Sequence, residues 1–497
     1  MLRQYFTLVG TGISSFSVNV PESVEVNRAN NLLQTTTERH AERFTTGLMW
    51  AEDEVCFPDS LPMAKKRLLA LERKLAKDLP LKEEVHNQIR MYVEKGFAHE
   101  ASNEEVLEAP PGRAWYLPIN VVGHPRKPEK KRLVWDAAAK VNGVSLNSKL
   151  LKGPDLLVQL PGVLCKFRQR RVAFGGDIEK MFHQIRIRKP DTHSQRFLFR
   201  FDPSESPKTY IMDVATFGAT CSPCSAQYVM HVNADQYKET YPEAAAAIKQ
   251  KTYMDDYFDS CDTVEEANAR ARQVHFIHSK AGFNMRNWMS NESTALVGLE
   301  KANRIQHKAI ELEQKEQIPR VLGLTWDTST DVIRFAANWQ DALNPYAVGE
   351  KRPTKRIVLR IVMSLFDPLG LLAPALIHGR ILMQDLSRSG LDWDAELSDS
   401  EHLKWQRWVN LLPGIERLEI PRWYFSKTSV VDYNSIQLHV FTDVSELGYE
   451  CAAYLRMATA SEINCCLVMA RSRVAPLKHL SIPRMELEAA LLGARRL

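Results

Sequence analysis

The sequence predicts an α+β fold, in which short strands and helices alternate along most of the chain. Between Trp115 and about Phe335, runs rich in β-branched and aromatic residues are interspersed with longer helical patterns. Two amphipathic helical patterns precede this region, and a pair of alternating, strand-like runs follows it near the C-terminus. This mixed order favours an α+β domain over a doubly wound parallel sheet.

The composition indicates a globular protein with more than one core. The chain has 497 residues, of which 44% are hydrophobic and 25% are charged. Its net charge is only +5, so contacts with a nucleic acid would have to come from local basic clusters. The eight cysteines are irregularly spaced, which does not suggest a secreted disulfide framework, and we expect a reducing compartment. We expect neither a signal peptide nor a membrane span.

Two amphipathic helices are predicted before the mixed region. The apolar positions that define their faces are Leu68, Leu71 and Leu75 in the first helix and Val85, Ile89 and Val93 in the second. Gly96 predicts the end of the second helix. The stretch 107–115 contains two prolines and a glycine and predicts a loop.

The mixed region contains several strand-like runs and two clear helices. The expected strands lie in 115–122, 131–136, 171–178, 184–188 and 196–201, and the expected helices in 223–241 and 263–283. Residues 353–432 open with a basic run and continue as apolar helix, and 435–456 alternate like a pair of strands.

Three carboxylates stand out against this background. Asp255 and Asp256 lie between strand-like flanks, which predicts a tight hairpin, and Asp177 follows a strand-like run. Adjacent carboxylates repel each other. The alternative to a functional role is that they form a solvated acidic turn. Together the three could hold two Mg²⁺ ions, which prefer carboxylate and phosphate oxygens and would offset the repulsion. Two such ions can clamp the attacking and leaving oxygens of a phosphoryl transfer.

The chain resembles the reverse transcriptases of Pao/BEL-type long-terminal-repeat retrotransposons. Asp177 with Phe182 is similar to motif A of that enzyme class, 215–230 to motif B, and 253–256 to motif C. The other segments that resemble this class are 116–122, 131–140, 150–157, 281–291, 321–327, 354–374 and 390–394. The resemblance covers nearly the whole chain, in the expected order.

The resemblance implies a right-hand polymerase with fingers, a ferredoxin-like palm and a thumb, followed by a connection region and a truncated RNase H-like domain. The expected parts are an N-terminal helical or extended region, 1–97; fingers and palm, 98–345; a thumb or connection-like region, 346–432; and the start of the RNase H-like domain, 433–497.

The resemblance also implies roles for individual residues of the polymerase site. Asp177, Asp255 and Asp256 would be catalytic and would carry two Mg²⁺ ions, with Mn²⁺ as an alternative, and the backbone carbonyl of Ile178 would contact a metal. Asp177 and Asp255 are the expected direct ligands, with Asp256 more supporting.

Four further residues are expected to bind the deoxynucleotide. Phe182 would be a steric gate whose ring collides with a ribose 2′-OH. Lys131 and Arg132 would hold the triphosphate, and Gly218 would let the backbone approach the nucleotide. Phe217 stands where retroviral enzymes often have Gln, which leaves the contact with base and template open. For Phe182 the bland alternative is core packing, and for Lys131 and Arg132 a solvated charge run.

The C-terminal part resembles the first strands and helix of a retroelement RNase H. Asp443 and Glu486 would be its first two metal ligands, now vestigial. Asp443-Val444-Ser445 stands where the family usually has Asp-Ala-Ser. The later acidic residues of an RNase H are absent before Leu497, so we expect no RNase H activity from this chain.

The leading hypothesis is therefore an RNA-directed DNA polymerase from a retrotransposon polyprotein. Its partners would be an RNA or DNA template with a primer and deoxynucleoside triphosphates, with no membrane. It would be intracellular, in a cytoplasmic particle, the nucleus or both. The basic clusters 165–171 and 349–356 suit contacts with a nucleic-acid backbone, or are solvated surface.

Two alternatives remain. One is a catalytically decayed or host-recruited nucleic-acid-binding remnant, and the other is a metal-dependent nuclease based on Asp443 and Glu486. Two further patterns are expected to be structural: the Cys221–Cys224 pair, despite its redox or zinc spacing, and His183 beside the expected gate.

Overall fold

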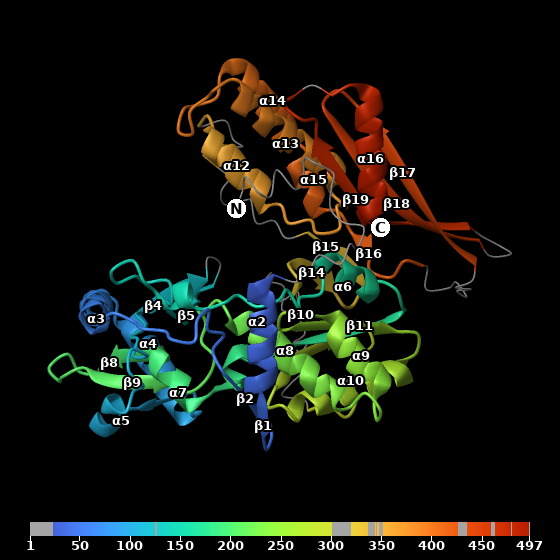
Figure 1. Cartoon of the computed structure of the whole chain (residues 1–497). Coiled ribbons are helices and arrows are strands. Elements are labelled where there is room, and N and C mark those ends of the chain that lie inside the picture. The colour runs from blue at the N-terminus through green and yellow to red at the C-terminus, as the bar shows by residue number, and fades with distance from the viewer. Residues whose placement is uncertain are drawn as a thin grey trace.

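The structure is a computed structural model of the chain, and its described residues form two lobes (Figure 1). These residues are 23–124, 127–300, 320–335, 343, 345–346, 351–425, 435–458, 463–478 and 480–496. The lower lobe holds the elements up to residue 300, and the upper lobe holds those from residue 351 onward (Figure 1). Within the described part of the chain, no helix is both long and apolar enough to cross a membrane.

The left side of the lower lobe in Figure 1 is built from the first half of the chain. Its elements are α3 (Leu61–Leu75), α4 (Leu79–Glu94), β3 (Ala98–Glu100), α5 (Asn103–Leu107), β4 (Ile119–His124), β5 (Lys127–Trp135), α7 (Lys189–Thr192), β8 (Arg196–Phe199) and β9 (Lys208–Met212). The elements α2 (Val24–Thr36), β1 (Glu38–His40) and β2 (Arg43–Thr46) lie in the middle of the lobe (Figure 1). Strands β3, β9 and β8 form one sheet, and β4 and β5 form an antiparallel hairpin. Helices α3 and α4 pack on these strands.

The two predicted N-terminal helices are confirmed, with one error in the second. Leu68, Leu71 and Leu75 are buried on α3, and α4 ends just before Gly96, whose φ is +64°. Val93, however, is exposed, and Tyr92 is buried instead. At 100° per residue, Tyr92 lies within the arc spanned by the buried positions of α4, whereas Val93 lies beyond its edge.

The right side of the lower lobe contains an antiparallel sheet with the strand order β10-β11-β6-β12. The strands are β6 (Val172–Ile178), β10 (Thr252–Tyr253), β11 (Asp256–Cys261) and β12 (Met285–Ser290). Helices α8 (Ser222–Asp235), α9 (Pro242–Lys251) and α10 (Val264–Ser279) lie beneath it in Figure 1, and α6 (Leu160–Phe167) lies above. Apart from the additional helix α9, the chain order β6-α8-β10-β11-α10-β12, with β6 and β11 as the inner strands, is that of a ferredoxin-like palm.

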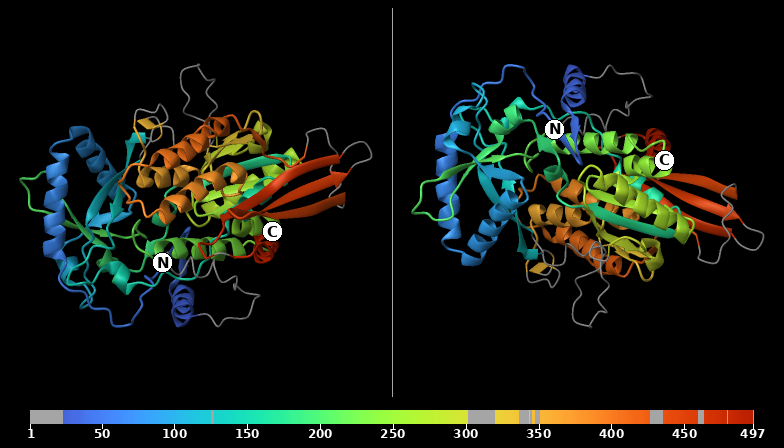
Figure 2. Two further views of the ribbon diagram at one scale, coloured as in Figure 1. Left: turned by 90° about the horizontal axis from the view of Figure 1, so that it is seen from above. Right: turned by 90° about the horizontal axis from the view of Figure 1, so that it is seen from below.

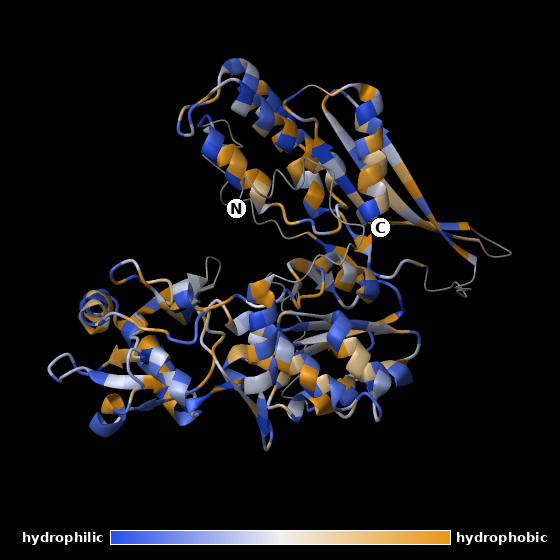
Figure 3. Cartoon of the chain, viewed as in Figure 1, coloured by the Kyte–Doolittle hydropathy of each residue, from blue (hydrophilic) through white to orange (hydrophobic). Residues whose placement is uncertain are grey.

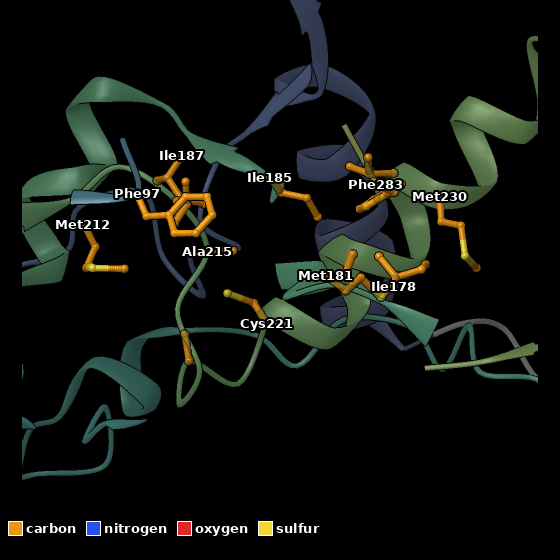
Figure 4. Packing of buried hydrophobic residues seen from close by; sticks show 14 of the residues in the cluster. Phe97, Ile178, Met181, Ile185, Ile187, Met212, Ala215, Cys221, Met230 and Phe283 are labelled. Atoms are coloured by element: carbon orange, nitrogen blue, oxygen red, sulfur yellow. The ribbon is translucent and has the colours of Figure 1, made fainter. Parts of the chain in front are cut away.

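One hydrophobic core connects the two sides of the lower lobe. Its buried residues run from Ala29 to Leu299, so the elements before residue 98 share a core with those that follow. Figure 4 shows part of this core, where Ile178 and Met181 lie close to Met230 of α8. Short elements complete the core region: β7 (Arg186–Ile187), which pairs in parallel with β2, and the 3₁₀ turn η2 (Met181–Gln184).

The upper lobe combines a helical layer with a three-stranded sheet. Its elements are α12 (Lys355–Ser364), α13 (Ala373–Arg388), α14 (Asp399–Val409), α15 (Leu412–Glu416), β17 (Ile436–Val444), β18 (Gly448–Ala458), β19 (Ile463–Val474) and α16 (Ile482–Arg496). Helix α13 packs on β19, and α16 packs on β17 and β18. The three strands extend beyond the palm in both views of Figure 2, and hydrophilic and hydrophobic residues alternate along the helices (Figure 3).

A small sheet lies between the lobes. It has the order β13-β14-β15-β16, with β13 (Arg320–Val321), β14 (Leu324–Asp327), β15 (Val332–Arg334) and β16 (Ile420–Pro421). The segment 321–327, which resembles the reverse transcriptase class, thus lies in the hairpin β13–β14 and is joined through β15 to a strand almost one hundred residues later.

The turn before α13 is fitted closely against β19. The Asp367 carboxylate accepts hydrogen bonds from the backbone N–H groups of Leu371 and Leu372, at 2.9 and 2.7 Å. Gly370 has a φ of +73°, and a Cβ atom there would lie 1.7 Å from the carbonyl oxygen of Ala470. Only glycine is compatible with this approach, which explains part of the 354–374 pattern.

Two buried arginines join the palm to the upper lobe. Arg422 pairs with Asp331 through Nε at 2.7 Å and Nη2 at 2.8 Å, and it donates to the carbonyl oxygens of Phe167, Arg170 and Arg171. Arg168 donates to the carbonyl oxygen of Arg422 at 3.1 Å and to that of Leu467 on β19 at 3.3 Å. Arg168 is fully buried, so the proposal that it contacts a nucleic acid is wrong.

The second basic cluster is also used within the protein. Lys355 is buried and donates to the carbonyl oxygen of Leu391, with its Nζ 4.9 Å from the centre of the Trp393 ring. Arg356 binds both carboxylate oxygens of Asp394, at 2.8 and 2.9 Å. The prediction that this cluster contacts a nucleic acid is therefore wrong for Lys355, and residues 349 and 350 lie outside the described residues.

We predict that Arg422→Gln destabilises the protein by about 3–5 kcal/mol, because it leaves the buried Asp331 carboxylate without its cation. Thermal or urea unfolding of the full chain measures this loss. The control is Arg352→Gln, which removes an arginine from an exposed pair with Asp399 and should cost at most about 1 kcal/mol. Equal losses for the two variants would contradict the structural role of Arg422.

Candidate functional site

The strand register of the palm brings the three predicted aspartates together. Asp177, near the end of β6, lies directly opposite Asp256, the first residue of β11. Tyr253 pairs with Asp256, so Met254 and Asp255 form a two-residue turn, and Met254 adopts a left-handed conformation with φ of +56°. The predicted tight hairpin is confirmed, and Asp255 lies at its tip.

Two hydrogen bonds hold this turn against the sheet and the helix layer. The backbone N–H of Ile178 donates to the carbonyl oxygen of Asp255 at 2.8 Å. The side-chain amide of Gln227, buried on α8, donates to the carbonyl oxygen of Met254 at 2.9 Å. Gln227 was not predicted from the sequence, because nothing in a helical run reveals which polar side chain reaches a turn. That the Ile178 carbonyl contacts a metal stays a prediction.

Two glycines allow the neighbouring strands to approach Asp177. A Cβ atom on Gly175 would lie 2.6 Å from the carbonyl oxygen of Tyr257 on β11. A Cβ atom on Gly176 would lie 2.9 Å from the carbonyl oxygen of Arg286 on β12. Both distances are shorter than van der Waals contact, so larger residues would push β11 and β12 away from the site.

Asp177 has two partners on β12 that the sequence did not reveal. Arg286 Nε donates to Asp177 Oδ2 at 3.2 Å, and Asn287 Nδ2 donates to Oδ1 at 2.5 Å. The Asp177 carboxylate is therefore directed toward β12. This orientation agrees with a second observation: among the described residues, no three or more His, Cys, Asp or Glu side chains are grouped closely enough to hold a metal ion.

The site carries negative charge that the surrounding protein balances only in part. Burial, then Asp255 and then Asp177 raise the pKa of Asp256 from 3.8 to about 7. The pKa of Asp255 is also raised, first by loss of hydration and then by Asp177, although Arg132 and Arg286 act in the opposite direction. Carboxylates that repel one another in this way are a suitable donor set for a divalent cation, which prefers oxygen ligands and would supply the missing positive charge.

The hairpin β4–β5 brings one of the two predicted cations to the carboxylates. Arg132 is exposed on β5 and lowers the pKa of Asp255, so it acts on the site electrostatically. Lys131 is the preceding residue on the same strand and therefore points to the opposite face. There its Nζ lies 3.2 Å from the position that a Cβ atom on Gly123 would take. The structure thus supports placing Arg132, but not Lys131, at the site.

The predicted gate is part of an aromatic pair. Phe182 on η2 is half-buried, and its ring centre lies 4.8 Å from that of Phe217. Phe217 thus supports Phe182 from the side, which is a role that the sequence comparison could not assign. That Phe182 excludes ribonucleotides stays a prediction.

Gly218 has a structural reason to be glycine. Its φ is +129°, and a Cβ atom there would lie 2.0 Å from the carbonyl oxygen of Trp135 at the end of β5. Asn147 also binds this loop, donating to the carbonyl oxygen of Gly218 at 2.9 Å. The close approach observed is therefore to the fingers hairpin, and the predicted approach to a nucleotide remains a prediction.

His183 and the cysteine pair belong to the core. His183 is buried between Tyr92 Oη and the carbonyl oxygen of Ala215, each at 2.9 Å, and burial lowers its pKa to about 4. Burial raises the pKa of the Cys221 thiol to about 11 and that of Cys224 to about 12. Neutral, buried thiols of this kind are poor nucleophiles and poor metal ligands.

The structure does not bring Asp443 and Glu486 together as predicted. Thr442 lies near Gly493 of α16, and Val444 packs with Ala489 of the same helix. Because side chains alternate along a strand, Asp443 points to the face of the sheet away from α16, which carries Glu486. The alternation of side chains along β17 therefore contradicts the predicted pairing of Asp443 with Glu486 as metal ligands.

We predict that Asp256→Asn raises the melting temperature of the metal-free protein, and that this gain grows between about pH 4 and pH 7 and then levels off. The folded-state pKa, about 7, exceeds the ordinary 3.8, so the folded protein holds this proton more tightly than the unfolded chain. That contribution to stability is complete below the ordinary pKa and is lost as the pH rises through 7. An asparagine at position 256 has no such proton to lose, so the variant does not lose this stability as the pH rises.

Thermal unfolding in a chelator at several pH values measures this effect. Asp235→Asn, in an exposed pair with Lys249, is the matched control. A melting temperature for Asp256→Asn equal to or below that of the wild type at pH 8 would contradict the charge imbalance.

Two family models match the chain, one after the other. Residues 142–319 match the family described as reverse transcriptase (RNA-dependent DNA polymerase), and residues 354–497 match the Pao retrotransposon-like RNaseH-like domain. No curated protein matches the chain. A solved structure of a foamy viral protease-reverse transcriptase in complex with double-stranded DNA is 15% identical, with a TM-score of 0.48 over 81% of this chain; the chain spans 58% of that protein's length. In this order, the two family matches show that the chain contains a reverse transcriptase domain followed by a Pao retrotransposon-like RNaseH-like domain.

Proposed function

We propose that the chain is an RNA-directed DNA polymerase that extends a primer with deoxynucleoside triphosphates in the palm. The observation that carries this proposal is the register of β6 and β11, in which Asp177 lies opposite Asp256 and next to the turn with Asp255, together with the raised pKa values of Asp255 and Asp256. The match of residues 142–319 to reverse transcriptases supports it. The partners would be an RNA or DNA template and its primer.

Reverse transcriptases use divalent metal ions, and the residues of this site suit such ions. We propose two Mg²⁺ ions held by Asp177 and Asp255, with Asp256 supporting them. When bound, they would stabilise the charge on the attacking and leaving oxygens of the phosphoryl transfer. Hard oxygen ligands and an excess of negative charge are what Mg²⁺ requires.

The protein's own side chains would orient the nucleotide. Arg132 approaches the carboxylates from β5 and would bind the triphosphate, whose charge it complements. Phe182 and Phe217 would form the wall beside the sugar, and their contact would keep the Phe182 ring from moving aside. The hydrogen bond from Gln227 would fix the turn that carries Asp255.

We predict that purified protein extends a primer on an RNA template with Mg²⁺, and that Asp255→Asn lowers the rate at least about a thousandfold, since a lost electrostatic contact to the reacting centre costs roughly 10²–10³ and a metal ligand more. Primer–template binding should persist. Asp235→Asn is the control and should retain the wild-type rate.

Equal rates for Asp255→Asn and the wild type would contradict the assignment of the site. Binding without any extension by the wild type would instead favour a nucleic-acid-binding remnant.

We predict that Phe182→Ala increases the incorporation of ribonucleotides relative to deoxynucleotides at least about tenfold, because a steric clash of 1–2 kcal/mol or more is removed. The ratio of kcat/KM for the two nucleotides measures this. Phe201→Ala, which removes an aromatic ring in the fingers, is the control. An unchanged ratio for Phe182→Ala would mean that this ring is only part of the core.

A further inference from the structure

We propose that Arg286 and Asn287 are positioning residues that hold the Asp177 carboxylate in the metal-free protein, and that a divalent cation must displace Arg286 to bind. This inference rests on the proposed function only in taking the palm carboxylates as a divalent-cation site. It assigns to β12 a role in setting metal affinity.

A β-bulge in β12 makes the double contact with Asp177 possible. Arg286 is the register partner of Asp177, but the next pair along the strand is Met289 with Gly175, so β12 contains one extra residue. At the bulge Asn287 adopts a left-handed conformation with φ of +53°. In a regular strand Arg286 and Asn287 would point to opposite faces, whereas here both side chains reach Asp177.

Gly176 accommodates the bulge. A Cβ atom there would lie 2.9 Å from the carbonyl oxygen of Arg286 and 3.2 Å from the Trp288 ring. Trp288 is fully buried and anchors β12 immediately after the bulge. The two glycines before Asp177 and the bulge opposite them therefore form one fitted arrangement.

The charges explain why the contact competes with a metal ion. Both oxygens of Asp177 are engaged, one of them by a guanidinium group. A divalent cation bound to the same carboxylate would lie beside that positive charge and be repelled by it. The metal-free protein, in turn, gains from Arg286, because this cation pairs with Asp177 and lies near enough to Asp255 to lower the pKa of that carboxyl.

Arg286 has a second carboxylate available when it leaves Asp177. Its Nη1 lies 3.7 Å from Glu179 Oε1, and Glu179 is fixed by Lys95 at 3.4 Å and by Asn284 at 3.2 Å. A shift of the guanidinium group toward Glu179 would keep it paired while it frees Asp177. The structure thus provides the displaced arginine with a partner, which keeps the cost of metal binding low.

The test is the affinity of the full chain for Mn²⁺, measured by electron paramagnetic resonance without nucleic acid or nucleotide. Arg286→Gln removes the competing charge and should tighten Mn²⁺ binding about threefold to tenfold, the value of a partly exposed ion pair. Arg286→Lys keeps the charge and should bind nearly as the wild type does. Asn287→Ala removes only a neutral donor and should give a smaller gain than Arg286→Gln.

Two controls make the result specific. Arg272→Gln removes an exposed arginine elsewhere in the palm and should leave the Mn²⁺ affinity unchanged, which excludes a general effect of net charge. Asp177→Asn should weaken Mn²⁺ binding in the wild-type background and abolish the gain from Arg286→Gln.

Unchanged or weaker Mn²⁺ binding by Arg286→Gln, with wild-type binding intact and lost in Asp177→Asn, would overturn the inference while leaving the metal site in place. If Asp177→Asn binds Mn²⁺ as the wild type does, the metal site itself is wrong, and the inference fails with it. The Mg²⁺ concentration for half-maximal primer extension gives a second readout and should fall by the same factor in Arg286→Gln.

Discussion

The antiparallel register of β6 and β11 is the constraint on which the candidate site depends. It places Asp177 opposite Asp256 and leaves Asp255 at the adjoining turn. A shift of one residue would turn these side chains to the other face of the sheet. The backbone contacts at Gly175 and Gly176 permit the close pairing that this register needs, and the hydrogen bond from Gln227 fixes the turn. The charge imbalance, the approach of Arg132 and the contact with Arg286 follow from it.

A second aspartate on β11, Asp259, differs from Asp256 because its charge is balanced by neighbouring groups. Asp259 is fully buried, yet it pairs with Lys251 and Arg270 and accepts a hydrogen bond from Tyr257 Oη at 2.7 Å. Asp256, three residues earlier, has a strongly raised pKa. Unbalanced charge costs stability, and proteins retain such costs mainly where function needs them. The contrast within one strand therefore supports the proposal that Asp256 belongs to the candidate site.

Buried arginines with a full set of acceptors hold the two lobes together. Arg168 and Arg422 satisfy backbone carbonyl groups from the palm, from the sheet between the lobes and from β19. Charged groups so fully buried are tolerated because every donor direction meets an acceptor. These hydrogen bonds attach the upper lobe to the end of α6. That helix packs on the sheet that carries the aspartates.

Much of this arrangement could be predicted from the sequence, because the signals are local. The hairpin at Asp255, the helices α3 and α4 and the palm strand β6 follow from turn chemistry and periodicity, whereas β12 was not predicted as a strand. The wrong or missing predictions concern features that local sequence patterns do not determine. The burial of Arg168 depends on β19, three hundred residues away. The bulge at Asn287 is a conformational exception within a strand, and the direction of Asp443 depends on which face α16 covers.

The most direct test of the central claim is anomalous diffraction from Mn²⁺ in crystals of the chain with an RNA template, a chain-terminated primer and a deoxynucleoside triphosphate. The account predicts anomalous peaks between Asp177, Asp255 and the triphosphate, with Arg286 moved toward Glu179. A bound nucleotide with ordered carboxylates but no peak between them, or with the metal held elsewhere, would contradict it.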